Sequence, residues 1–286
     1  MPTDNRRIQG PEISTPYCVF GSSTENEDED GCFKSTDPLS STRKDGRALL
    51  EHRKIYMKTG VVSQAKGSAY IELNNTKVIC SVFDPREIPN RVEYSQHGEL
   101  FCVLKFAPFS CTTRRSHQQD AEEKELSLNL KRALEPAVCR HEFPNFQVDI
   151  YVLILESDGG SLAASITCAG LALADAHVPM YDLVTAASLG VAGDVLMKDP
   201  SEEEEKLCSQ HFERSNLNHG LITVSLMGAH TQITQVWQTG SMTTTCVSES
   251  LTHLIQSCEE TYPIAQRCLV KSVVDTISKK KVPEQS

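Results

Sequence analysis

The alternation of apolar and polar residues predicts a chain built from hairpins, central strands and helices. Apolar and β-branched runs on either side of the short polar turns Asn74-Asn75 and Ala229-His230 predict two hairpins, over residues 67–87 and 220–240. The other expected strands cover residues 99–109, 146–156 and 181–193. The expected helices, from apolar residues at helical spacing, cover residues 121–138, 161–177, 246–261 and 263–278. Because hairpins argue against an all-parallel doubly wound sheet, we expect a mixed α/β fold with two β-rich halves, each backed by helices.

The two ends of the chain differ from this pattern. Residues 1–40 include the acidic run "STENEDEDG" and are too polar to bury a core, so we expect a mostly flexible tail. A folded domain is expected over 41–278, with halves of about 41–178 and 179–278, and its regular structure is expected to begin near Ile55. Residues 279–286 form a short basic tail beginning Lys279-Lys280-Lys281.

Composition narrows the class of protein. The chain has 286 residues, 39% of them hydrophobic, and no apolar run approaches the ~20 residues of a membrane helix. The first residues contain no apolar stretch, so no secretory signal is expected. The 11 cysteines stand singly, which favours reduced core thiols in a cytosolic or nuclear protein over a metal site or disulfide framework. A net charge of −10 indicates that any RNA contact is made through a local patch or within a larger assembly.

One motif carries candidate chemistry. The segment "SDGGSLAASITCAGLALADAH" (157–177) places two glycines before a helix of small residues, which can pack very closely against its neighbours. Glycines that open a helix often cradle a phosphate, because the first backbone N–H groups of a helix attract anions. The residue after Gly159-Gly160-Ser161 is Leu162, which can neither donate a hydrogen bond nor offset negative charge.

This motif and its surroundings resemble the RNase PH family of phosphorolytic ribonucleases. In that family Asp-Gly-Gly opens a small-residue helix, and a Pro-Met-x-Asp-Leu-Val strand follows, as in "SDGGSLAASITCAGLALADAHVPMYDLV" here. The segments "KDGR", "GSAYIELNNTKVICSV" and "ELSLNLKRALEP" match the family in the same order over roughly residues 43–275. The resemblance implies the RNase PH fold, which is related to the ribosomal protein S5 domain 2-like fold, and it is strongest to members that build the ring of the eukaryotic RNA exosome.

The resemblance also implies what the site lacks. Active members carry a phosphate-binding arginine where this chain has Leu162, and metal-binding aspartates near the positions of Asn216 and Ile222. A further arginine of active members is replaced by Glu122. The resemblance therefore implies a degenerate phosphate loop at Gly159, Gly160, Ser161 and Leu162, with no catalytic residue, cofactor or metal.

A basic patch is the candidate RNA contact. The resemblance places Arg114 and Arg115 along the RNA path of the family, and Lys131 and Arg132 on its RNA-facing helix. Side chains of this kind bind the RNA backbone without reading sequence, although solvated surface charge explains them equally simply. Trp237 is expected in the core or in an interface rather than stacked on a base.

Other polar residues have simpler interpretations. His211 and His219 flank a polar loop without partners at metal-ligand spacing, so we interpret them as surface residues. Asp158 is expected to cap the helix that follows the glycines. Asp182 is expected to be structural, and Glu202–Glu205 to form a solvated helix face.

Three functions remain in view. The first is a non-catalytic structural subunit of the RNA exosome core ring, implying as partners other RNase PH-like subunits, S1/KH cap subunits, single-stranded RNA in the channel and a separate 3′-5′ nuclease. The second is an active phosphate-dependent 3′-5′ exoribonuclease, whose missing groups a partner would supply. The third is an RNA-binding module that acts alone, which the net charge disfavours. For the first, the resemblance implies the nucleus and nucleolus, and also the cytoplasm.

Overall fold

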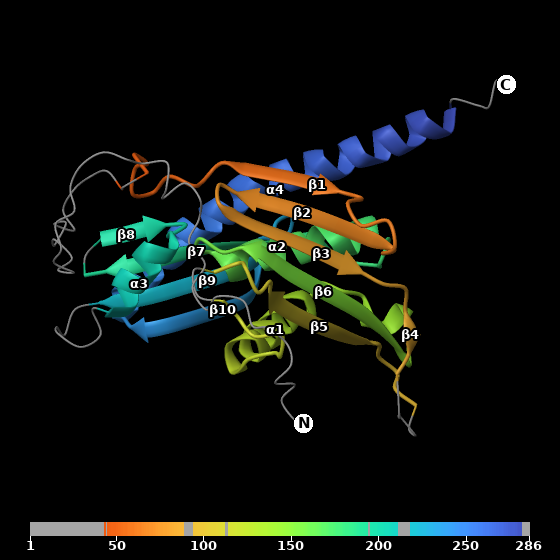
Figure 1. The fold of residues 1–286 in the computed structure, drawn as a ribbon, viewed down its shortest axis with the longest axis horizontal. Helices are drawn as coiled ribbons and strands as arrows, with labels where there is room; N and C mark the ends of the chain where they lie inside the picture. The colour runs from red at the N-terminus through yellow and green to blue at the C-terminus, as the bar shows by residue number, and fades with distance from the viewer. Residues whose placement is uncertain are drawn as a thin grey trace, which may run out of the picture.

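Two β-sheets and four α-helices make up the fold in a computed structural model that describes residues 43, 45–88, 94–111, 114–193, 195–210 and 218–281 (Figure 1). The strands of the first sheet are β1 (Ile55–Thr59), β2 (Gly67–Leu73), β3 (Thr76–Val82), β4 (Arg86–Glu87), β5 (Glu99–Phe106) and β6 (Phe146–Glu156). The strands of the second sheet are β7 (Val184–Ala192), β8 (Val195–Lys198), β9 (His219–Met227) and β10 (Gln232–Ser241). The helices are α1 (Ala121–Leu134), α2 (Ser161–Asp175), α3 (Glu202–Gln210) and α4 (Thr244–Lys281), with a 3-10 turn η2 (Arg140–Glu142).

The first sheet is mixed, as the sequence predicts. Strands β1, β2, β3 and β6 run antiparallel in that order, and β5 pairs with β6 in parallel after a crossover through α1. The predicted hairpin turn is confirmed between β2 and β3, where Asn74 takes the positive φ of 51° that an asparagine tolerates. Strand β6 lies inside the sheet, between β3 and β5, as its apolar sequence indicates.

The second sheet is antiparallel in the order β10-β9-β7-β8, and its β9–β10 hairpin is the predicted one. Its two faces have different neighbours. Ile222, Val224 and Leu226 pack with Leu254 and the rest of the α4 cluster. The alternate residues of β9 face the opposite way, toward the side of α2 and α3.

Helix α2 lies between the two sheets and contacts both (Figure 1). Two glycines set these contacts. A Cβ on Gly67 of β2 would stand 2.2 Å from the backbone nitrogen of Ala176, and a Cβ on Gly170 of α2 would stand 2.7 Å from the carbonyl oxygen of Val184. The small-residue helix predicted from the sequence is therefore the central packing element, and twelve of its fifteen residues are buried.

The C-terminal region differs from the prediction. Residues 244–281 form one helix, α4, where the sequence analysis expected two helices separated at Pro263. Pro263 is exposed, so the carbonyl group that its ring leaves unpaired lies on the side of the helix that faces water. The continuous helix crosses the second sheet and passes β1, and its last turns project beyond the body of the molecule (Figure 1).

Smaller differences concern boundaries and short strands. The helix expected over 121–138 ends at Leu134, and strands β1, β4 and β8 were not predicted. The predicted N-terminal tail lies outside the described residues, and α4 runs to Lys281, past the expected domain end. All nine described cysteines are free, and no described helix is long and apolar enough to span a membrane.

Candidate functional site

The Gly159-Gly160 loop joins β6 to α2. Both glycines have positive φ values, 74° and 62°, a backbone region that favours glycine. Gly160 stands at the N-cap position of α2, and no side chain caps the helix there. The expectation that Asp158 caps α2 is therefore wrong: its carboxylate accepts hydrogen bonds from Asn75 Nδ2 at 3.1 Å and from the backbone N–H of Glu202, at the start of α3, at 3.4 Å.

A buried ion pair fills the inner side of the loop. Arg53 donates to both carboxylate oxygens of Asp199, from Nη2 to Oδ1 at 2.6 Å and from Nε to Oδ2 at 2.8 Å. The same guanidinium donates to the carbonyl oxygens of Asp158 (2.6 Å) and Gly159 (3.1 Å). A Cβ on Gly160 would stand 2.8 Å from Arg53 Nη2 and 3.0 Å from Asp199 Oδ1. The second glycine is therefore required by the ion pair beneath the loop.

The outer side of the loop is closed by a second carboxylate. Glu205 of α3 accepts a hydrogen bond from the backbone N–H of Gly160 at 2.8 Å. This N–H is one of the groups that an anion at the start of α2 would need. The expectation that Glu202–Glu205 forms a solvated helix face is wrong for Glu205, and also for Glu204, whose carboxylate lies 3.5 Å from Arg43 Nε.

The two carboxylates have opposite pKa shifts. Burial alone would raise the pKa of Asp199, but the hydrogen bonds and positive charge of Arg53 outweigh burial and hold this pKa at about 2. Burial raises the pKa of Glu205 to about 7, although the Gly160 N–H and Arg53 act in the other direction. Asp199 is therefore a permanent anion, whereas Glu205 binds a proton near neutral pH.

Two further arginines stabilise this corner of the molecule. Arg43 donates from Nη2 to the carbonyl oxygens of Lys198 (2.6 Å) and Leu49 (3.0 Å). Arg47 forms an ion pair with Asp45 at 3.0 Å. Both side chains are largely buried. They hold the segment around residues 43–51 in place and are not accessible to a ligand.

Leu162 lies in the hydrophobic core. Its side chain is 5% exposed and belongs to the large cluster formed by α2 and the first sheet. The position at which the resemblance implies a phosphate-binding arginine therefore contributes packing here. Ser161, one residue earlier, accepts the hydroxyl of Ser165 on its carbonyl oxygen at 2.6 Å.

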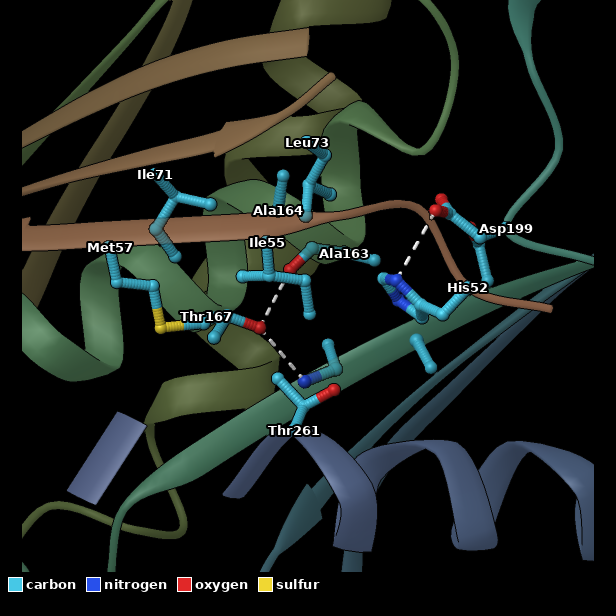
Figure 2. A pocket seen from close by; sticks show the side chains of 13 residues that line it. His52, Ile55, Met57, Ile71, Leu73, Ala163, Ala164, Thr167, Asp199 and Thr261 are labelled. Atoms are coloured by element: carbon cyan, nitrogen blue, oxygen red, sulfur yellow. Dashed lines mark hydrogen bonds and ion pairs between the residues drawn. The ribbon is translucent and has the colours of Figure 1, made fainter. Parts of the chain in front are cut away.

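Figure 2 shows a small cavity that Asp199, the partner of Arg53, lines on one side. This cavity of about 10 Å³ between β1, α2, β7 and α4 has room for one water at most. His52 points across it toward Asp199, with Nδ1 3.5 Å from Oδ2, and the Thr167 hydroxyl donates to Ala163 and accepts the N–H of Ala186, both at 3.0 Å. A nucleotide cannot enter from this side.

The position expected for a lost aspartate is a core position. Ile222 is fully buried and faces α4, on the side of the second sheet away from the loop. Its neighbours Leu221 and Thr223 lie on the face of the loop, since a Cβ on Gly190 would contact Leu221 and Ser188 lies beside Gly160. Asn216 lies outside the described residues.

The predicted RNA contacts form two separate groups. Arg115 is already engaged: Nη1 lies 2.9 Å from Glu122 Oε2, and the guanidinium carbon lies 4.1 Å from the centre of the Phe106 ring. Arg114 beside it is exposed. Glu122, where the resemblance implies an arginine in active members, thus forms an ion pair with the neighbouring Arg115. This turn lies close to the loop, because the N–H of Ser157 donates to the carbonyl oxygen of Ser110.

Lys131 and Arg132 lie in the last turn of α1, about 14 Å along the helix axis from Glu122. Lys131 lines a shallow groove of about 250 Å³ between α1 and β5, and Arg132 is exposed. The structure does not bring the four basic residues into one patch, and their role in RNA binding stays a prediction.

The remaining candidates have structural surroundings. Asp182 accepts the Tyr262 hydroxyl at 3.0 Å and the N–H of Ala229 at 2.7 Å, so the structural interpretation is confirmed. Trp237 packs against the main core, as expected. His219 is 5% exposed and is not the surface residue that was expected, while His211 lies outside the described residues. Among the described residues no group of three or more His, Cys, Asp or Glu is arranged to hold a metal ion.

Sequence reasoning missed the cluster of Arg53, Asp199 and Glu205. Its only signals were two charged segments, "EHRK" and "KDPSEEEE", that lie about 150 positions apart. Chemically, the cluster can bind the loop to its own carboxylate and hold it rigid. It offers no unpaired positive charge to an incoming phosphate.

Comparison with known proteins identifies the class. Residues 51–179 match the model of the RNase PH family, described as the 3′ exoribonuclease family, domain 1. The chain is 35% identical over 288 residues to the exosome complex component MTR3 of Homo sapiens, an alignment that covers 95% of this chain and 96% of that protein. The chain belongs to the RNase PH family.

Particular relatives and structures agree with this assignment. The chain is 39% identical over 240 residues to the exosome complex component RRP41-like of Arabidopsis thaliana, covering 84% of this chain and 88% of that protein. A chain of the Archaeoglobus fulgidus exosome with RNA bound to the active site superposes with a TM-score of 0.66 at 21% identity, covering 77% of this chain and 91% of that chain. Rice Rrp46 superposes with a TM-score of 0.61 at 22% identity, covering 77% and 99%. These two structures confirm the predicted fold.

Proposed function

We propose that this chain is a non-catalytic structural subunit of an RNA exosome core ring. The proposal is supported by relatives that are named as exosome components and align over nearly the whole chain. In this role the chain holds neighbouring RNase PH-like subunits in place, supports cap subunits and contributes to the path of single-stranded RNA toward a separate nuclease.

One observation carries the non-catalytic part of the proposal: the Gly160 N–H is bound to the chain's own Glu205 carboxylate. Leu162 turns into the core beside it, so the loop keeps the shape of a phosphate site, but the Gly160 donor is occupied and position 162 supplies no cation. Phosphorolysis requires that both be aimed at the charge that develops during phosphoryl transfer. Loss of one preorganised donor typically reduces a rate by a factor of about 10² to 10³.

The test is a phosphorolysis assay on the full-length chain and on the assembly purified with it from its own cells. Single-stranded RNA and inorganic phosphate are supplied, and release of nucleoside diphosphates is measured beside an active phosphorolytic nuclease. We expect no release from the isolated chain, and an assembly of several different chains by native mass spectrometry. Release by the isolated chain, or a homo-oligomer of this chain alone, would overturn the proposal.

A second candidate is an active phosphate-dependent 3′-5′ exoribonuclease. The presence of the Glu205 carboxylate at the loop favours it, because a carboxylate can assist proton transfer. It requires a neighbouring subunit to supply the cation that Leu162 does not. The same assay separates the two candidates, since only this one predicts nucleoside diphosphate release by the assembly that is lost on Glu205→Gln substitution.

Two finer points belong to the same proposal. Exposed Arg114 and Arg132 would contact RNA through the phosphate backbone, so single Arg→Ala variants should each weaken RNA binding by the assembly and reduce its salt dependence. We also propose residence in the nucleus and nucleolus and in the cytoplasm, which microscopy of the tagged chain would test.

A further inference from the structure

The last three turns of α4 contain no buried side chain among those that the structure describes. Ala265 is fully buried and Leu269 packs against the main core, but none of the described side chains from Val270 to Ser278 is buried. The helix nevertheless continues to Lys281, about 18 Å beyond Leu269. Figure 1 shows this end standing clear of both sheets.

An apolar stripe runs along this projecting end. Val270, Val273, Val274 and Ile277 follow the spacing i, i+3, i+4, i+7 and therefore lie on one face of the helix. Their exposed fractions are 63%, 56%, 56% and 47%. This is the arrangement of anchors by which an amphipathic helix binds in a hydrophobic groove.

The residue types of this segment indicate that another surface packs against the stripe when the protein functions. Valine, isoleucine and threonine are weaker helix formers than leucine or alanine, because the preceding turn restricts their χ1 rotamers. Five of the twelve residues from Val270 to Lys281 are of this kind. In water such a segment gains little from remaining helical, whereas packing of its apolar face supplies most helical stability in proteins.

The charge around the stripe specifies the partner. From Arg267 to the end of α4 the chain carries five basic residues and one acidic residue, Asp275. The basic residues are Arg267, Lys271, Lys279, Lys280 and Lys281. The chain as a whole has a net charge of −10, so this end is a basic island on an acidic protein. We propose that the projecting end of α4 docks in an apolar groove rimmed by carboxylates on a different protein chain.

Charge also argues against a second copy as the partner. A parallel pair of these helices would place the two lysine runs side by side. An antiparallel pair centred between Val273 and Val274 would place Lys280 of one copy beside Arg267 of the other, and both arrangements are repulsive. A membrane surface fits less well, because the stripe contains no Trp, Phe or Leu, the residues typical of helices that lie in a bilayer interface.

The inference rests on the proposed function only in that the chain works within an assembly. Its test is a photo-crosslinking residue at position 273 of the full-length chain, expressed in its own cells, with the same residue at the exposed position Thr252 of α4 as the control. We expect position 273 to crosslink to one other chain, within a segment where Asp or Glu flank apolar residues. Crosslinks to a second copy, to residues 1–42 of the same chain, to lipid or to no molecule would each overturn the proposal.

Two substitutions complete the test. Val274→Asp should weaken retention of the crosslinked chain at least tenfold in a pull-down of the assembly, because it places a carboxylate against a carboxylate-rimmed groove. Val236→Asp is the matched control, since Val236 is 45% exposed on β10. Equal retention by the two variants would refute the docking proposal while leaving the ring proposal intact. Failure of the wild-type chain to enter any hetero-assembly would instead refute the proposed function.

Discussion

The Gly159-Gly160 loop and the projecting end of α4 differ in how far their contacts are made within the chain itself. At the loop, Arg53, Asp199 and Glu205 occupy donors and acceptors that a ligand would otherwise use. At the end of α4, Val273 and Val274 are both 56% exposed.

The difference shows that a ligand-like sequence motif and a need for a ligand are separate properties. The loop has the glycines of an anion site, yet its Gly160 N–H is already bonded to Glu205, so an anion there would have to replace an existing hydrogen bond. The α4 end has no recognisable motif, yet it exposes apolar area whose burial is favourable. We therefore expect a binding partner at the exposed apolar face of α4 and not at the glycine loop.

The largest expected effect is the loss of the buried pair beneath the loop. Asp199→Ala should reduce the free energy of unfolding by about 3–5 kcal/mol, because it leaves Arg53 as an uncompensated buried charge. Urea denaturation of the isolated chain measures this. Glu156→Ala, which removes the exposed ion pair with Lys77 at 2.7 Å, is the control and should cost less than about 1 kcal/mol. Equal costs would mean that the pair beneath the loop is solvated.

Truncation of Leu162 should have the next largest effect. Leu162→Ala should cost about 2–5 kcal/mol, since Leu162 is 5% exposed and its removal leaves a cavity in the core. The same denaturation experiment applies. A cost below about 0.5 kcal/mol would place the side chain at the surface and reopen the phosphate-site interpretation.

A smaller effect, dependent on pH, is expected at Glu205. Its pKa in the folded chain is about 7, above the ordinary value of 4.5, so the folded state holds a proton that the unfolded state has already released between these pH values. Stability contributed by the protonated carboxyl is present below about pH 4.5 and is lost as the pH rises through about 7. Glu205→Gln keeps a hydrogen-bond acceptor for the Gly160 N–H and has no charge to bury.

The melting temperature of Glu205→Gln relative to the wild type should therefore be higher at pH 8 than at pH 5. Glu249→Gln, at an exposed position of α4, should show the same difference at both pH values. A Glu205→Gln difference that does not change with pH would show that this carboxyl has an ordinary pKa.

The smallest effect is expected at the projecting helix. Val274→Ala in the isolated chain should change the free energy of unfolding by no more than about 0.5 kcal/mol, because a side chain that is 56% exposed has little packing to lose. A loss of about 2 kcal/mol or more, as expected for truncation of a core residue such as Leu162, would show that the stripe is packed within the monomer.

Local sequence patterns predicted most of the fold. The β2–β3 hairpin, the central strand β6 and the small-residue helix α2 each follow from the periodicity and turn residues of one continuous segment. The single helix α4 could not be predicted in this way, because a proline inside a helical pattern usually indicates a helix end. Only the path of the helix shows that Pro263 faces water.

The site could be predicted only in part. The glycines and Leu162 are local features, whereas Arg53 and Asp199 meet across 146 positions of sequence. Glu205 reads as one of four similar glutamates, and nothing local distinguishes the one that turns toward Gly160. The face on which Ile222 lies depends on the register of β9, where a shift of one residue exchanges core and site.

The two glycine contacts of α2 have a mechanical consequence. Neither the approach of Gly67 to Ala176 nor that of Gly170 to Val184 leaves space for a methyl group, so the spacing between the two sheets is set by backbone against backbone. Backbone atoms in such contact cannot yield as flexible side chains can. The two sheets should therefore move as one rigid body. A force applied to one sheet is transmitted to the other, because no hinge between them absorbs it.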